Sequence, residues 1–436
     1  MDATAKEEHG FKAKVSSPEA WIALGLASLF FAIFCGNAFI AVGHGAIVVG
    51  LLMGLFRRSH ERLDWSGLRP SSWWLIAFVL AAVISVAVNW GSMLSPDGAL
   101  KKLRHFVVFI LLLLLPNLRK SAFVSMKYRS ACILLWWVGL VASVIVGGIS
   151  FFFGEKFPLF NSFGHEGRLS GFYGQVMTFA YILQFSVLAL AAFVVYPGVF
   201  RKLIRLPWWS VFPVGLIAAW GQYFAYSRGA ILGVAVGLLA MALMHSKRLT
   251  LVVLLVGVLA GGYAYKDSWA GGDTPLYFRV SDPVRTNQWK TAMLAFIDNP
   301  VFGLGYKDFE VKCLELKEKF QIEPAYLIIE DGVSRYEYFK GHAHNNWLEA
   351  LASTGALGGI AFAGFCLSWL REAWQYRRTA GIFVPLVLAF IVSGCFENTF
   401  YDSEVMSCIM LIYFCSQIAF DRQSQGREPE PVKLPT

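Results

Sequence analysis

Long apolar stretches recur along almost the whole of this chain, and their length is the feature that most constrains its fold. A helix of about 20 apolar residues crosses a hydrocarbon core about 30 Å thick. The pattern therefore predicts an all-α polytopic membrane protein with about twelve transmembrane helices. The stretches occupy residues 19–36, 38–56, 73–90, 104–117, 131–153, 171–196, 207–225, 229–245, 249–265, 346–370, 380–396 and 404–420. The fourth is short, so the count is defined to within one helix.

The composition excludes an ordinary soluble domain. Hydrophobic residues make up 56% of the chain and charged residues only 15%, whereas soluble domains carry about 25% charged residues. The first apolar stretch follows a polar tail and precedes no small-x-small cleavage site, so we expect an anchor rather than a signal peptide. Of the seven cysteines, only Cys313 falls in the longest polar segment, which makes a disulfide within that segment impossible.

The distribution of Lys and Arg predicts the orientation. Short segments on the side of the N-terminus hold 22 of these residues, against 6 in short segments on the opposite side. By the positive-inside rule, both termini lie in the cytoplasm, and this rule explains the net charge of +9 better than nucleic-acid binding does. The predicted division is a cytoplasmic tail (1–18), helices 1–9 (19–265), a large loop on the outer side (266–345), helices 10–12 (346–420) and a cytoplasmic tail (421–436).

Three arginines break this charge pattern, because Arg104, Arg168 and Arg228 fall on the outer side. Arg228 is the sharpest case, since it lies in a tight Ser-Arg-Gly connection between two apolar helices. One interpretation is an arginine that snorkels to a lipid phosphate. The other is a fixed guanidinium that awaits an anionic ligand, because a charge at such depth needs a partner.

The large loop has secondary structure of its own. Ser281-Asp282-Pro283 is a typical helix start and Asn299-Pro300 a stop, which predicts a helix over residues 283–298. On it, Arg285 and Trp289 share a face with apolar residues. This spacing directs Arg285 toward a site or the membrane surface, or into a cation–π pair with Trp289. A second, amphipathic helix is predicted at about residues 306–320.

The loop ends on two histidines, His342 and His344, directly before the tenth apolar stretch. Asn345 is a suitable N-cap for that helix. The positive end of the helix dipole then favours a neutral His344, which is suited to take a proton from a hydroxyl group. The alternatives are two histidines hydrogen-bonded in a loop, or zinc binding. No cysteine or third histidine lies nearby at ligand spacing, and the loop has no Asp-x-Asp pair, so we predict no metal.

These residues resemble a known family. His344-Asn345, nine residues, Gly355, two residues and Gly358 match the His-Asn-x9-Gly-x2-Gly signature of O-antigen ligases. Three further elements resemble segments of this family in the same order, all of them on the predicted outer side. They are Gly167-Arg168-Leu169-Ser170-Gly171, then Ser227-Arg228-Gly229, and then Arg285 and Trp289 followed by Asn299-Pro300, Gly303 and Gly305.

The resemblance implies an enzyme of the bacterial inner membrane with a periplasmic active site. It would transfer a polysaccharide from undecaprenyl pyrophosphate to lipid A–core, without a metal, a nucleotide or any other cofactor. Because pyrophosphate is a good leaving group, the catalyst mainly stabilises its developing charge, which arginines do through forked donors. The implied roles are His344 as general base, Arg228 and Arg285 on the pyrophosphate with Arg168 third, and His342, Asn345 and Trp289 in support.

Related activities remain open alternatives. O-antigen polymerases and protein O-oligosaccharyltransferases share the lipid-linked donor, although the signature spacing and the expected lack of a further C-terminal domain favour a ligase. A transporter or flippase would carry ionisable residues in the middle of its helices, and the apolar stretches have no central Asp, Glu, Lys or Arg. The expected partners are the glycan donor, the lipid A–core acceptor and membrane lipids, with no nucleic acid and no obligate protein partner.

Overall fold

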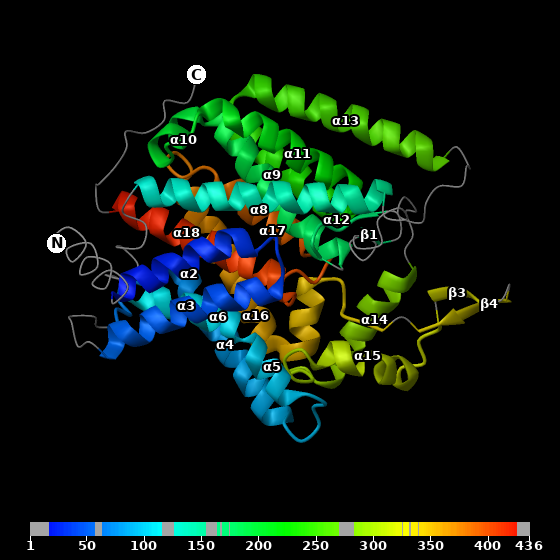
Figure 1. Cartoon of the computed structure of the whole chain (residues 1–436). Helices are drawn as coiled ribbons and strands as arrows, with labels where there is room; N and C mark the ends of the chain where they lie inside the picture. Colours follow the sequence, from blue (N-terminus) through cyan, green and yellow to red (C-terminus); the bar gives the residue numbers. More distant parts are fainter. Residues whose placement is uncertain are drawn as a thin grey trace. The chain divides into compact units, whose positions relative to one another are not determined.

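The computed structural model is dominated by helices (Figure 1). The residues that it describes form two compact units, one within residues 17–69, 105–226 and 403–424, and the other within residues 70–104 and 227–402. The described residues are 17–56, 63–115, 126–153, 164–165, 168–173, 175–269, 283–324, 326–330, 333–338 and 340–424. Most of both predicted tails, and the predicted helix start at Ser281-Asp282, lie outside them.

The first unit is a bundle of apolar helices with one short hairpin. The helices α2 and α3 approach each other closely, because a Cβ atom on Gly25 would lie only 2.6 Å from the Gly43 carbonyl oxygen. In the hairpin, His165 pairs with Arg168. The elements are α2 (Pro18–Ala32), α3 (Asn37–Phe56), α6 (Arg104–Leu114), α8 (Met126–Phe153), β1 (Gly164–His165), β2 (Arg168–Leu169), α9 (Val176–Val195), α10 (Pro197–Leu203), η2 (Trp208–Ser210), α11 (Val211–Phe224) and α18 (Ser403–Ser424).

The second unit contains most of the residues that the sequence singles out. A shared apolar core joins two helices of the polar loop to the start of α16, and includes Ala292, Phe309 and Ala343. A two-stranded antiparallel hairpin, with Tyr326 opposite Glu337, completes the loop. The elements are α4 (Pro70–Asn89), α5 (Pro96–Lys102), α12 (Arg228–His245), α13 (Lys247–Trp269), α14 (Pro283–Asp298), α15 (Asp308–Lys319), β3 (Tyr326–Glu330), β4 (Val333–Glu337), α16 (Asn346–Gln375) and α17 (Phe383–Ser393).

Polar contacts at both ends show that α4 and α16 run antiparallel along each other. At one end, the backbone N–H and hydroxyl of Ser71 donate to the Glu372 carboxylate at 2.8 and 2.6 Å. At the other end, the Ser85 hydroxyl donates to the Ser353 carbonyl at 2.9 Å. Antiparallel packing is what the alternating orientation of the third and tenth predicted spans requires.

The helix α16 is broken near its start, at Gly355, whose φ of 65° and ψ of −164° are not helical. The turn that follows α14 fills the break: Leu304 N–H donates to the Ala352 carbonyl at 2.9 Å, and Ala356 N–H to the Pro300 carbonyl at 2.8 Å. A Cβ atom on Gly303 would lie 2.6 Å from the Gly355 nitrogen. Gly303 and Gly355 therefore allow the backbone of the turn after α14 to pack directly against the backbone of α16. The close contact at Gly355 is thus made with this turn.

The structure supports the predicted class and adds detail. Each of the twelve predicted stretches overlaps one helix, and seven helices in the described residues are long and apolar enough to cross a membrane. The chain is thus a multi-pass membrane protein, while the count of twelve spans and the domain boundaries remain predictions. The loop helices agree closely with α14 and α15. The two hairpins were not predicted.

Candidate active site

The two loop histidines flank a buried alanine directly before α16. Ala343 has no exposed surface, and its N–H donates to the buried Glu349 carboxylate at 2.9 Å. His344 adopts a left-handed backbone with φ of 49°, a conformation that non-glycine residues rarely adopt without support from their surroundings. This backbone brings the rings of His342 and His344 together, with their centroids 4.3 Å apart.

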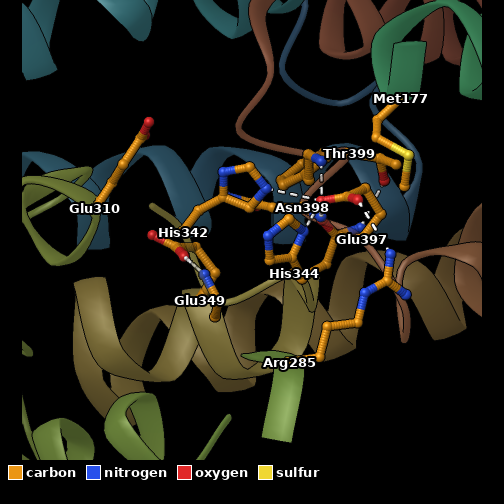
Figure 2. A network of polar contacts seen from close by, with 12 residues as sticks. Met177, Arg285, Glu310, His342, His344, Glu349, Glu397, Asn398 and Thr399 are labelled. Carbon is orange, nitrogen blue, oxygen red and sulfur yellow. Dashed lines mark hydrogen bonds and ion pairs between the residues drawn. The ribbon is translucent and has the colours of Figure 1, made fainter. Parts of the chain in front are cut away.

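A third residue, Glu397, joins the two histidines. Its Oε1 atom lies 2.7 Å from His342 Nε2 and 2.7 Å from His344 Nδ1 (Figure 2). The same oxygen accepts the backbone N–H of Asn398 at 3.0 Å. Side-chain exposure falls from 31% for His342 to 15% for His344 and 5% for Glu397, so the carboxylate lies beneath two accessible rings. We call these three residues the histidine–glutamate cluster.

Two asparagines at the start of α16 hold the segment that carries Glu397. Asn345 is the N-cap, as predicted: its Oδ1 atom accepts the N–H groups of residues 347 and 348 at 2.9 and 3.1 Å. Its amide also donates to the Cys395 carbonyl at 3.0 Å. The buried Asn346 donates to the Thr399 hydroxyl at 2.8 Å and accepts the Phe400 N–H at 2.9 Å. These bonds place Glu397 beside the histidines.

The charges of the cluster stabilise each other. Burial by itself raises the pKa of the Glu397 carboxyl, but His344 and His342 together hold that pKa well below its ordinary value. Burial lowers the pKa of His342, and the hydrogen bond and charge of Glu397 raise it above the ordinary histidine value. Glu349 and Glu310 act on His342 in the same direction. The site therefore contains an ionised carboxylate that can orient and charge an imidazole.

Arg285 reaches the cluster from α14. Its Nη2 atom lies 3.9 Å from Glu397 Oε2 (Figure 2), beyond the ordinary length of a hydrogen bond. The arginine thus points toward the histidine–glutamate cluster, and its predicted function in binding a ligand stays a prediction. Trp289, one helical turn further along α14, is partly buried. The predicted cation–π pair between Arg285 and Trp289 stays a prediction.

Arg228 and Arg168, the other two arginines predicted to bind pyrophosphate, lie on other elements of the structure. Arg228 is exposed at the first residue of α12, where Ser227 is the N-cap residue. Arg168 donates from Nε and Nη2 to the Ala225 carbonyl, at 3.1 and 3.0 Å, and from Nη2 to the Tyr226 carbonyl at 3.3 Å. These carbonyls follow the end of α11, so Arg168 caps that helix. Whether Arg168 also binds a ligand stays a prediction.

Sequence reasoning did not predict that Glu397 contacts the histidines. It also did not predict that Asn345 and Asn346 bind the segment that carries Glu397. Glu397 lies 53 residues from His344, and no motif connects the two. The available signal was an acidic residue between two apolar stretches, followed by Asn398 and Thr399. The sequence comparison of ligand spacings considered only neighbouring residues, whereas the fold brings the Glu397 carboxylate to the two histidines from a distant segment.

Comparison with known families supplies the remaining evidence. Residues 213–363 match the family model described as O-antigen ligase. Over this segment, the chain is similar to O-antigen ligases. The comparison with curated proteins found no match. The O-antigen ligase segment includes Arg228, Arg285, His342 and His344, whereas Glu397 lies outside it. The chain is thus a multi-pass membrane protein that contains a segment similar to O-antigen ligases.

Proposed function

We propose that this protein is an O-antigen ligase of the bacterial inner membrane. It transfers a polysaccharide from undecaprenyl pyrophosphate to a sugar hydroxyl of lipid A–core on the periplasmic side. The observation that carries the proposal is the 2.7 Å contact between His344 Nδ1 and the Glu397 carboxylate. This contact orients the ring of His344, which lies just before α16 within the segment similar to O-antigen ligases.

The contact with the Glu397 carboxylate favours one tautomer of His344. When Nδ1 carries the proton and donates it to Glu397, the lone pair lies on Nε2. Nε2 is then the atom that accepts the proton of the acceptor hydroxyl, while Glu397 stabilises the imidazolium that forms. His344 is the proposed general base and Glu397 its positioning residue. His342 shares the same carboxylate oxygen and is the weaker candidate for the base.

The arginines are proposed to stabilise the leaving group. The contact between Arg285 and Glu397 is long, so a pyrophosphate oxygen with more negative charge competes well for the guanidinium. Arg228 is the second donor. It begins α12, which packs against α17, and α17 leads directly to the segment of Glu397. In the predicted topology these two helices are antiparallel, so Arg228 and Glu397 belong to the same side of the membrane. Arg168 is the least supported, since the Ala225 carbonyl already accepts hydrogen bonds from its Nε and Nη2 atoms.

The proposed reaction is a direct displacement without a metal. The acceptor oxygen forms a bond to the anomeric carbon as the bond from that carbon to the pyrophosphate oxygen breaks. The hydroxyl proton passes to His344 Nε2, and undecaprenyl pyrophosphate leaves with its charge neutralised by arginine. A single displacement inverts the configuration at the anomeric carbon.

Reconstitution in vesicles tests this function directly. Purified protein receives a lipid-pyrophosphate glycan together with lipid A–core, and in parallel with a second copy of the donor as the acceptor. Transfer to lipid A–core is the expected result. Transfer only to the donor identifies a polymerase, and transfer only to a protein acceptor identifies a protein O-oligosaccharyltransferase. Movement of the donor across the membrane without transfer identifies a flippase.

The catalytic assignment has a separate test. His344→Ala is expected to lower the transfer rate by about 10²–10⁴-fold, the usual contribution of a general base. The matched control is His245→Gln, because His245 lies at the far end of α12. A His344→Ala protein that folds normally and transfers at the control rate contradicts the assignment.

A further inference from the structure

The histidine–glutamate cluster has the composition of a transition-metal site. His342 Nε2, His344 Nδ1 and a Glu397 carboxylate oxygen all lie within 4.8 Å of one another. They come from two segments that precede α16 and α18 (Figure 2). Two imidazole nitrogens and one carboxylate oxygen, with a further position open, are the ligands of many zinc sites. The partial exposure of both rings leaves that further position accessible from solvent.

The ligands are held in place by a second layer of hydrogen bonds. Asn345 and Asn346 tie the two segments together, as described above. Ala343 N–H is bound by Glu349, which fixes the backbone between the two histidines. Such outer contacts raise metal affinity, because the ligands need little rearrangement when the ion arrives.

The surrounding charges favour one class of cation. Arg285 lies 3.9 Å from Glu397 Oε2 and opposes any cation, whereas the Glu349 carboxylate, which accepts the Ala343 N–H between the two histidines, attracts one. With these contributions of opposite sign, the two imidazole ligands decide selectivity. Imidazole suits Zn²⁺, Cu²⁺ and Ni²⁺, while Mg²⁺ and Ca²⁺ prefer oxygen ligands.

We propose that Zn²⁺ binds to His342, His344 and Glu397 and thereby inhibits the enzyme. The metal replaces the protons that His342 Nε2 and His344 Nδ1 donate to Glu397. A neutral His344 ring that coordinates through Nδ1 carries its remaining proton on Nε2. Nε2 then has no lone pair for the acceptor hydroxyl, so the metal-bound cluster cannot act as a base. The metal site stands on the geometry alone, whereas the inhibition rests on the proposed function.

Direct binding tests the site independently of activity. Co²⁺, whose visible bands report coordination, is titrated into detergent-purified protein from which any polyhistidine tag has been removed, and Zn²⁺ then displaces it. One ion per chain is expected. His342→Ala and Glu397→Gln are each expected to weaken binding at least about tenfold, and His245→Gln is expected to bind like the unaltered chain. Binding that is absent, or that is equal in all four proteins, overturns the site.

The inhibition is then measured in the reconstituted vesicles. Stoichiometric Zn²⁺ is expected to lower transfer at least about tenfold, a chelator to restore it, and Mg²⁺ to have no effect. Transfer that continues with Zn²⁺ bound overturns the inhibition. If no transfer to any acceptor occurs in the absence of Zn²⁺, the proposed function fails, and the Co²⁺ spectrum still decides whether the site exists.

Discussion

The break in α16 makes a strong prediction for Gly355→Ala. The backbone at this position has φ of 65° and ψ of −164°, a region that essentially only glycine adopts, and forcing another residue into it costs about 1–3 kcal/mol. The new Cβ atom would lie 2.3 Å from both the carbonyl carbon and the oxygen of Val301. Overpacking of this kind costs about 1–3 kcal/mol more. We therefore expect a loss of about 2–6 kcal/mol in the free energy of unfolding.

Thermal unfolding in detergent measures this loss, with Gly45→Ala as the matched control. Gly45 lies in α3, and a Cβ atom there would meet nothing within 4 Å. The control is expected to be neutral or stabilised by up to about 1 kcal/mol, since alanine has the higher helix propensity. If Gly355→Ala unfolds at the same temperature as Gly45→Ala, the account of the broken helix is wrong.

The same substitution is expected to reduce activity. The first turns of α16 position His344 through the Asn345 cap, and the 299–305 turn enters the helix at the break. A displacement of about 1 Å in a catalytic group costs about 100-fold in rate. Glycan transfer by Gly355→Ala vesicles, compared at equal amounts of folded protein, is expected to fall toward that value.

The remaining predictions concern the cluster itself. Glu397→Gln is expected to lower transfer by about 10²–10⁴-fold, whereas Glu315→Gln, at an exposed residue of α15, is expected to leave the rate unchanged; equal rates in the two variants would refute the positioning role. Asn346→Ala removes two buried hydrogen bonds and is expected to cost about 2–6 kcal/mol of stability in the same unfolding assay, so an unchanged midpoint contradicts the contacts described. Complete chelation of divalent ions is expected to leave transfer intact or to raise it, and a loss that one divalent ion restores would exclude the metal-free reaction.

Much of this protein could be predicted from its sequence because the signals are local. The length of each apolar stretch predicts a helix, and in the part of the chain that the structure describes seven helices are long and apolar enough to cross a membrane. Pro283 and Asn299-Pro300 predict both ends of α14, and Asn345 predicts the cap of α16. Each of these features depends on residues within one or two helical turns, where side-chain chemistry and backbone geometry are directly coupled.

Only the tertiary structure decided which residues meet. Nothing in the sequence connects Glu397 with His344, because their contact forms across 53 residues through asparagines that bind a distant backbone. The signature glycines likewise have a structural reason that appears only when the turn at Gly303 enters the break at Gly355. Hydrogen bonds and close packing between remote segments depend on how the helices assemble. Unlike the position of a single helix, that assembly cannot be read from the spacing of apolar residues along the sequence.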